Sequence, residues 1–175
     1  MSQSFLDPKE VLSQLGLRPN MVVADFGCGS GGFALPLAQK LEDGLVYALD
    51  VREAPLSSLK SWAIMKKLSN IRFVRCDLEK PKGSTLPEIS LDLVIIASTL
   101  FQAEDKESIV CEAKRVLKKE GILAIIDWLP DSIQGPDTGR ISPEQAKKLA
   151  QDCGFKIEKE IEAGKYHYGF VFKKS

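Results

Sequence analysis

Four glycines stand within a short stretch near the N-terminus, DFGCGSGG at residues 25–32. Glycine has no side chain, so such a stretch makes a tight turn and lets a ligand approach the backbone closely. The stretch fits the GxGxxG pattern of dinucleotide-binding loops, and similar loops bind nucleoside triphosphates and S-adenosylmethionine. The glycines therefore predict a ligand-binding loop without deciding among these ligands.

Aspartates stand where three apolar runs end. Asp25 stands near the end of MVVADF, Asp50 ends GLVYALD and Asp77 ends IRFVRCD. Asp50 follows the glycines by about 20 residues, where a carboxylate on the second strand can accept hydrogen bonds from both hydroxyls of a ribose. Asp77 would reach the exocyclic amine of an adenine, with a polar turn as the alternative. The loop and the acids together favour a ligand that contains adenosine.

The elements that must position these residues alternate between strand and helix patterns. Apolar runs predict strands at residues 21–26, 44–50, 71–77, 91–98 and 121–128, and a closing antiparallel hairpin at 155–163 and 165–174. Helices are expected at residues 7–17, 31–43, 55–68, 104–118 and 142–154, with loops at 81–90 and 129–142. This alternation predicts an α/β domain with a mostly parallel sheet.

In open α/β sheets, ligands bind beyond the carboxyl ends of the strands. Besides the three aspartates, these ends carry Ser98, Thr99, Phe101 and Gln102 after the fourth strand, and Asp127 and Trp128 at the end of the fifth. We therefore expect these side chains to lie around one site.

The charge before the glycines separates two candidate ligands. A dinucleotide places its pyrophosphate at the start of the first helix, where Asp25 would repel it. S-adenosylmethionine has no phosphate and carries a sulfonium cation, beside which a carboxylate is acceptable. The terminal hairpin is also more typical of methyltransferases than of dehydrogenases. The sequence favours S-adenosylmethionine over a nicotinamide cofactor.

Several motifs resemble the class I S-adenosylmethionine-dependent methyltransferases, specifically the small ubiquinone/menaquinone-biosynthesis-like branch. The matching stretches are VVADFGCGSGGFALPLA, VYALDV, FVRCDLEK, LDLVIIASTLFQ, EAKRVLKKEGILAIIDW and AQDCGF, in the family's order. The resemblance implies a Rossmann-like, doubly wound sheet of seven strands in the order 3-2-1-4-5-7-6. In that sheet strand seven is antiparallel and helices cover both faces.

The resemblance also implies which residues bind the cofactor. The glycines would approach its methionine and ribose portions, Asp50 would hold the ribose, and Ser98 or Thr99 would lie near the sulfonium. The expected cofactor-binding set is Asp25, Gly27, Cys28, Gly29, Gly31, Asp50, Val51, Arg52, Asp77, Leu78 and Ser98. The fourth strand ends in ASTLFQ, without the Asn/Asp-Pro-Pro-aromatic signature. This departure disfavours methylation of an amino group on adenine or glutamine.

Methyl transfer needs a general base only when the acceptor must lose a proton. The candidates for catalytic roles are Asp127, His167 and Tyr166, with a surface or hydrogen-bonded structural histidine as the alternative for His167. The expected acceptor pocket comprises Thr99, Phe101, Gln102, Trp128 and Arg140, and Arg140 would meet an acidic group of the acceptor. Residues 1–19 form an N-terminal arm and helix that could act as a lid.

The composition limits the remaining possibilities. The chain has 175 residues and a formal net charge of zero, which predicts a single domain over residues 1–175 and disfavours a nucleic-acid partner. Its four cysteines form no CxxC pair, so neither a zinc site nor a disulfide framework is expected and reduced thiols are the default. No apolar run reaches the length of a membrane span, and the N-terminal residues MSQSFLDPKE lack the basic-then-apolar pattern expected of a signal peptide. These features favour a cytoplasmic monomer or homodimer.

The sequence therefore predicts an S-adenosylmethionine-dependent methyltransferase whose partner is a small-molecule acceptor. A nicotinamide-dependent (NAD) oxidoreductase and a non-catalytic cofactor-binding protein stay open as alternatives.

Overall fold

A computed structural model describes residues 5–175 of the chain. Its seven strands form one sheet in the order β3-β2-β1-β4-β5-β7-β6, in which β7 runs antiparallel to both of its neighbours. The strands are β1 (Val22–Phe26), β2 (Leu45–Asp50), β3 (Ile71–Arg75), β4 (Leu91–Ala97), β5 (Leu117–Trp128), β6 (Phe155–Ile161) and β7 (His167–Lys174). The expected fold class, strand order and antiparallel last strand are confirmed.

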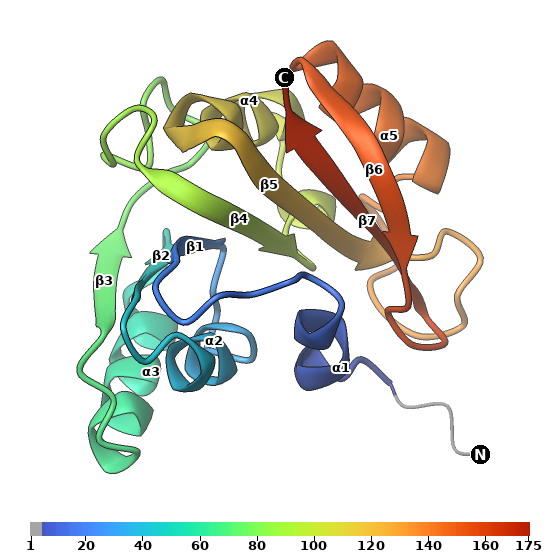
Figure 1. The fold of residues 1–175 in the computed structure, drawn as a ribbon. Helices are drawn as coiled ribbons and strands as arrows, with labels where there is room; N and C mark the ends of the chain where they lie inside the picture. The colour runs from blue at the N-terminus through green and yellow to red at the C-terminus, as the bar shows by residue number, and fades with distance from the viewer. Residues whose placement is uncertain (1–4) are drawn as a thin grey trace.

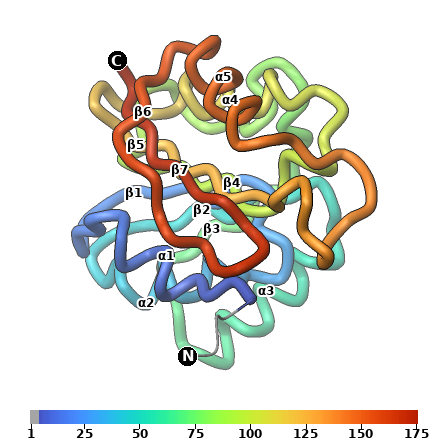
Figure 2. The backbone as a smooth tube through the Cα atoms, turned by 90° about the vertical axis from the view of Figure 1, so that its right-hand side faces the viewer, coloured from blue at the N-terminus to red at the C-terminus, as the bar shows by residue number. Residues whose placement is uncertain are grey.

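Helices cover the two faces of this sheet (Figure 1). They are α1 (Pro8–Ser13), α2 (Ala34–Lys40), α3 (Glu53–Met65), the short 3-10 helix η1 (Leu100–Gln102), α4 (Lys106–Val116) and α5 (Pro143–Asp152). One hydrophobic core lies between the sheet and α1, α2 and α3, and the other lies between the sheet and α4 and α5. Figure 2 views the sheet from the side of the β6–β7 hairpin.

The helix starts follow the local sequence signals. The Asp7 side chain accepts a hydrogen bond from the Lys9 amide ahead of α1. Ser142 and Gln145 form a reciprocal capping box at the start of α5. Such caps satisfy backbone N–H groups that have no partner within the helix. They fix where α1 and α5 begin.

The boundary between α4 and β5 differs from the expectation. The helix ends at Val116, and the strand begins at Leu117 rather than at residue 121. Leu117 pairs with Leu91 beside a register shift, and Lys118 forms an ion pair with Asp92 at 2.9 Å. The run LKKE resembles a helix C-terminus in sequence, but pairing with β4 places it in the sheet.

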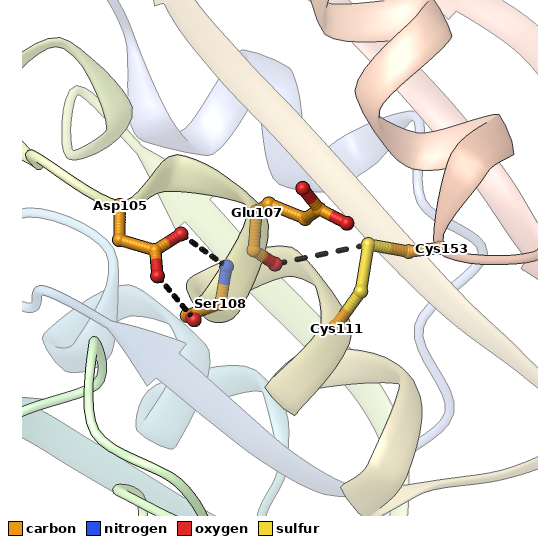
Figure 3. Close-up of a disulfide and its surroundings, with 5 residues drawn as sticks. All are labelled: Asp105, Glu107, Ser108, Cys111 and Cys153. Carbon is orange, nitrogen blue, oxygen red and sulfur yellow. Dashed lines mark hydrogen bonds between the residues drawn. A yellow bond between two sulfur atoms is a disulfide. The ribbon is translucent and has the colours of Figure 1, made fainter.

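A disulfide joins Cys111 on α4 to Cys153, the residue that follows α5 (Figure 3). Their Cα atoms are 5.2 Å apart, and 42 positions separate them in the sequence. The expectation of four reduced thiols is therefore wrong for this pair. The spacing of the cysteines gives no sign of the bond, because it depends on how α4 and α5 pack on the same face of the sheet. Cys28 and Cys76 are free thiols.

Within residues 5–175, no helix is both long enough and apolar enough to cross a lipid bilayer.

Candidate active site

The glycine loop connects β1 to α2 and requires glycine at several positions. Gly27, Gly29 and Gly31 have φ angles of +79°, +51° and +99°, a backbone region that residues with side chains rarely adopt. A Cβ on Gly27 would clash with Thr99, and one on Gly31 would clash with Leu59. The loop is therefore packed closely against β4 and α3, and it leaves its backbone open to a ligand.

Asp50 ties this loop to the end of β2. Its Oδ2 accepts a hydrogen bond from the Gly29 amide at 3.0 Å, and its Oδ1 accepts one from the Arg52 amide at 2.9 Å. The Arg52 Nε is 3.2 Å from Oδ1, on a side chain that is largely exposed. The carboxylate is thus held in place by the backbone, while its charged partner is free to move aside for a ligand.

A cavity of about 210 Å³ lies beside Asp50, at the carboxyl ends of β2, β3 and β4. Its lining includes eight of the residues expected around the site: Gly27, Asp50, Val51, Arg52, Asp77, Leu78, Thr99 and Gln102. It also includes Cys76, Glu79, Ala103 and Ile109, which the sequence analysis did not assign to the site. Ile109 belongs to the apolar face of α4, and its position in the sequence does not distinguish a cavity wall from the core.

Asp25 lies on the other face of the sheet from most of this cavity wall, close to the start of α2. It is 2% exposed, and among residues 5–175 its Oδ2 has no hydrogen-bond partner. Burial raises the pKa of Asp25 to about 7, the Ala34 amide opposes this shift, and the charge of Asp50 adds to it. A cation placed beside Asp25 would favour its ionised form.

The segment after β4 is held against the glycine loop. Thr99 Oγ1 is 3.0 Å from the Phe26 carbonyl oxygen and 3.1 Å from that of Ala97. Ser98 has a φ angle of +50°, and the Gln102 side chain donates a hydrogen bond to its carbonyl oxygen at 3.0 Å. This strained turn brings the ends of β1 and β4 together where the sulfonium is expected.

Asp127 is buried at the end of β5. Its Oδ1 accepts a hydrogen bond from the Trp128 amide at 2.8 Å. Burial raises the pKa of Asp127 to about 6, against the opposing effect of the Trp128, Phe101 and Leu100 amides. The carboxyl group therefore faces the backbone of η1, the segment that carries Phe101 and Gln102.

Trp128, His167, Tyr166 and Phe5 form an aromatic cluster. Trp128 and His167 are direct partners on β5 and β7, and their ring centroids lie 4.1 Å apart. Phe5 covers them, with centroids 5.6 Å from Trp128, 5.5 Å from Tyr166 and 5.8 Å from His167. The structure thus brings together three predicted site residues, and it places one described residue of the expected arm above them. Residues 1–4 of that arm lie outside the described part of the chain.

His167 is 4% exposed, so it is not a surface histidine. Neither of its ring nitrogens has a hydrogen-bond partner in the part of the chain that the structure describes, and the same is true of Trp128 Nε1. Burial lowers the pKa of His167 to about 4, so the ring is neutral at neutral pH. The hydrogen-bonded structural histidine considered from the sequence is not found either.

Arg140 lies in the β5–α5 loop (residues 129–142) and bonds to that loop's own backbone. Its Nη1 donates to the carbonyl oxygens of residues 129, 130 and 132, its Nη2 to that of residue 134, and its Nε to that of residue 136. The same loop passes over two other residues, because a Cβ on Gly135 would clash with Trp128 and one on Gly139 with Phe101. The structure therefore shows Arg140 ordering a loop over the site.

Comparison with known proteins identifies the family. A model described as a methyltransferase domain matches residues 17–169. The chain belongs to this methyltransferase domain family. It is 32% identical over 124 residues to sterol 24-C-methyltransferase ERG6B of Gibberella zeae, an alignment that covers 70% of this chain and 32% of that protein. It is 24% identical over 153 residues to the ubiquinone/menaquinone biosynthesis C-methyltransferase UbiE of a Marinomonas species, covering 83% and 60% of the two. The chain spans about a third of the length of the sterol methyltransferases that it matches.

Solved structures agree with the family. A SAM-dependent methyltransferase from Aquifex aeolicus superposes with a TM-score of 0.88 at 29% identity, covering 97% of this chain and 90% of that one. The [4+2]-cyclase SpnF superposes with a TM-score of 0.82 at 16% identity, covering 95% and 79%, and so shows the fold alone. The chain therefore contains a methyltransferase domain of the S-adenosylmethionine-dependent class.

The residues present fit this methyl donor. Two buried carboxyl groups, Asp25 and Asp50, flank the glycine loop, and the Oδ2 of Asp25 is left without a partner within the described residues. This arrangement suits the sulfonium and ammonium groups of S-adenosylmethionine better than a pyrophosphate. When bound, the donor supplies a methyl group that is already activated for displacement. The match to the methyltransferase domain family also favours S-adenosylmethionine over a nicotinamide cofactor.

Proposed function

We propose that this methyltransferase transfers the methyl group to a small-molecule acceptor by in-line displacement. The observation that carries the proposal is the enclosure of the aromatic cluster of Phe5, Trp128, Tyr166 and His167. Phe5 packs over Trp128 and His167, and the β5–α5 loop passes over Trp128, which favours a small acceptor at this end of the site. A base is needed only if the acceptor must lose a proton.

The chain's relatives support a small-molecule acceptor. Their names include sterol, ubiquinone/menaquinone and trans-aconitate methyltransferases, all of which act on small molecules. The aromatic cluster of Phe5, Trp128 and Tyr166 would pack well against rings or an unsaturated chain. We therefore propose a sterol-like or quinone-like acceptor.

The donor end would work as follows. Asp50 would accept hydrogen bonds from the ribose hydroxyls, and Asp77 with Leu78 would bind the adenine, since all three line the cavity. Asp25 would face the cationic end of the donor. Thr99 and Ser98 would border the methyl group, because they join the end of β4 to the glycine loop. Holding acceptor and methyl in line would remove much of the barrier, since effective molarities supply about 7–11 kcal/mol.

Calorimetric titration with S-adenosylhomocysteine tests the donor end. Replacing Asp50 by alanine removes a buried carboxylate that the loop and the ribose would share. We expect the dissociation constant to rise at least roughly 100-fold, which corresponds to a loss of about 2.7 kcal/mol of binding free energy. Asp43→Ala, which removes an exposed aspartate before β2, is the matched control and should bind as the wild type does. Wild-type affinity in Asp50→Ala would contradict the assignment.

The acceptor is tested with labelled methyl donor and a fractionated cell extract. We expect label in an extractable small molecule and none in protein or nucleic acid. Label in a macromolecule would overturn the proposed acceptor class. Donor binding without transfer to any fraction would instead favour the non-catalytic alternative.

A further inference from the structure

The outer face of α3 is unusually poor in charge for a helix at the surface. Its inner face, with Leu56, Leu59 and Ala63, is buried where α3 packs on β2 and β3. Apart from Glu53 and Lys60, the exposed side chains of α3 are uncharged: Ala54, Ser57, Ser58, Ser61, Trp62, Ile64 and Met65. On α5, by contrast, every exposed side chain is polar. Apolar residues therefore lie on both faces of α3, whereas a surface helix normally keeps its outer face polar.

Three large apolar side chains gather in the last turn of α3. Trp62, Ile64 and Met65 are 48%, 68% and 71% exposed. Successive helical residues are about 100° apart, so Met65 points away from the buried face, and Trp62 and Ile64 lie on either side of it. Single exposed apolar residues are common, but a group of them is typical of an interaction surface.

The chain around this turn carries only positive charge. Residues 54–76 include Lys60, Lys66, Lys67, Arg72 and Arg75 and no acidic residue, although the whole chain has equal numbers of acidic and basic residues. Arg75 forms an ion pair with Glu53 at 3.1 Å. The three lysines are exposed, and none has an ion-pair partner within residues 5–175. They and the three apolar residues together form the α3 surface.

A pocket of about 440 Å³ continues the α3 surface towards α1 and α2. Trp62 and Lys66 line it, together with Lys9 on α1 and residues 30–32 of the glycine loop. Asp7 also lines the pocket, but its carboxylate already accepts a hydrogen bond from the Lys9 amide. Figure 1 shows these three helices on the same side of the sheet. The pocket thus adds one more cation beside the apolar turn.

We propose that the α3 surface binds to a membrane that contains anionic phospholipids. Trp62, Ile64 and Met65 would enter the boundary between headgroups and acyl chains, while the lysines would stay at the lipid phosphates. Tryptophan suits this depth, because its ring is apolar and its N–H can form a hydrogen bond at the headgroups. The inference goes beyond the proposed function, because no residue of the α3 surface lines the donor cavity or belongs to the aromatic cluster.

Two other partners fit the α3 surface less well. A second copy of the chain would bring the lysines of both copies together around a two-fold axis, where like charges repel. A nucleic acid would match the lysines and could stack a base on Trp62, but it would leave Ile64 and Met65 without an apolar partner. A lipid surface offers anionic and apolar groups in the same thin layer, which is the combination that the α3 surface presents.

Co-sedimentation with vesicles tests the role of the lysines. The chain should bind vesicles of phosphatidylcholine and phosphatidylglycerol in equal parts, and should bind pure phosphatidylcholine at least roughly tenfold more weakly. The double variant Lys66→Glu, Lys67→Glu should lose at least roughly tenfold in affinity for the anionic vesicles. Lys119→Glu, Lys156→Glu is the matched control, because it makes the same change in net charge at exposed sites on β5 and β6. The control should bind as the wild type does, and equal losses in the two double variants would overturn the proposal.

The apolar residues are tested by substitution and by fluorescence. Ile64→Ser, Met65→Ser changes two exposed side chains, so its melting temperature should match the wild type while its affinity for anionic vesicles falls at least roughly tenfold. The chain has two tryptophans, Trp62 and Trp128. Lipids brominated near the headgroup end of their acyl chains should quench the wild type but not Trp62→Phe, in which only Trp128 remains. Equal quenching of both proteins would overturn the proposed insertion.

The outcomes separate this inference from the proposed function. Failure of the chain to bind anionic vesicles would overturn the inference, while calorimetric titration with S-adenosylhomocysteine in the absence of vesicles would still report on the proposed function. Self-association that Ile64→Ser, Met65→Ser removes, without vesicle binding, would assign the α3 surface to a second copy of the chain. Tighter binding to a single-stranded RNA than to anionic vesicles would assign it to nucleic acid. Either of these two results would overturn the proposal.

Discussion

The proposed donor end and the proposed acceptor end of the site are built differently. At the donor end the Asp50 carboxylate is held by two backbone amides beside an open cavity. At the acceptor end Trp128 and His167 are closed beneath Phe5, and their side-chain nitrogens have no partners in the described chain. The Asp50 carboxylate is thus positioned without a ligand, whereas the nitrogens of Trp128 and His167 are buried without hydrogen-bond partners.

The difference follows from what each end must recognise. A donor of fixed structure can be met by a rigid loop whose hydrogen bonds also hold the fold together. Asp25 contributes one unpaired oxygen beside the glycine loop, whereas Trp128 and His167 contribute three unpaired nitrogens, so the larger loss of stability is expected around Trp128 and His167. Proteins commonly place such strain at functional sites. Four changes test this contrast.

The largest effect is expected behind the donor cavity, where the disulfide ties α4 to α5. Joining positions 42 apart restricts the unfolded chain, so replacing Cys111 and Cys153 by serine should lower the free energy of unfolding by about 3–4 kcal/mol. Urea unfolding with and without a thiol reductant measures this. The reductant should destabilise the wild type and leave the double variant unchanged. Four titratable thiols in the unfolded, unreduced wild type would contradict the bond.

A smaller effect is expected within the glycine loop. Gly31→Ala combines a positive φ angle with a clash against Leu59, so stability should fall by about 2–3 kcal/mol and S-adenosylhomocysteine should bind at least tenfold more weakly. Gly29→Ala is the matched comparison, because Gly29 also has a positive φ angle but an added Cβ would meet no atom within 4 Å. Its free energy of unfolding should fall by only about 1 kcal/mol. Equal losses in the two variants would show that the loop is not packed as described.

The third test concerns the protonation of Asp25 beside the glycine loop. Its pKa is raised from 3.8 to about 7, so the folded protein binds this proton more strongly than the unfolded chain does. Stability contributed by the protonated group is present below about pH 4 and is lost as pH rises towards 7. Asp25→Asn should therefore be more stable than the wild type at pH 8, by on the order of 2 kcal/mol, and the gap should shrink at pH 5.

Thermal melts of both proteins across this pH range measure the gap. Asp43→Asn, which changes an exposed aspartate, controls for the altered net charge and should show no trend with pH. A gap between Asp25→Asn and the wild type that is the same at pH 5 and pH 8 would mean that Asp25 is already ionised in the folded state.

The smallest effect is expected at the lid over the acceptor end. Phe5 is half exposed, so Phe5→Ala should lower stability by about 1 kcal/mol or less. It should nevertheless open the cluster, since Phe5 contacts both Trp128 and His167. Acrylamide should quench Trp128 more strongly in the Trp62→Phe, Phe5→Ala protein than in Trp62→Phe alone. Unchanged quenching would show that Phe5 does not shield Trp128 in the aromatic cluster.

Much of the donor end could be predicted from the sequence. The aspartates at the ends of three apolar runs, the glycine spacing and the capping pairs are local patterns, and a parallel sheet brings the strand ends together. The start of β5 was predicted wrongly, because LKKE follows a helix and joins the sheet only through its pairing with β4. The place of Ile109 in the cavity wall could not be predicted, because an apolar helical face has the same sequence pattern whether it lines a cavity or packs on other side chains.

The acceptor end depended on longer-range pairing. The sequence identified Trp128, His167, Tyr166 and Arg140 as candidates. It could not show that the two rings stack or that Arg140 bonds to its own loop. The stacking depends on the register between β5 and β7, strands that are separated in the chain by a loop, helix α5 and strand β6.

The sequence by itself determined the α/β fold, the order of its elements and the kind of methyl donor, because these depend on periodicity and on side chains fixed at strand ends. Only the tertiary structure decided the disulfide, the burial of His167 and the closure of the acceptor end. Those features arise where elements distant in the chain meet, and hydrophobic packing and strand register, rather than local propensity, bring them together.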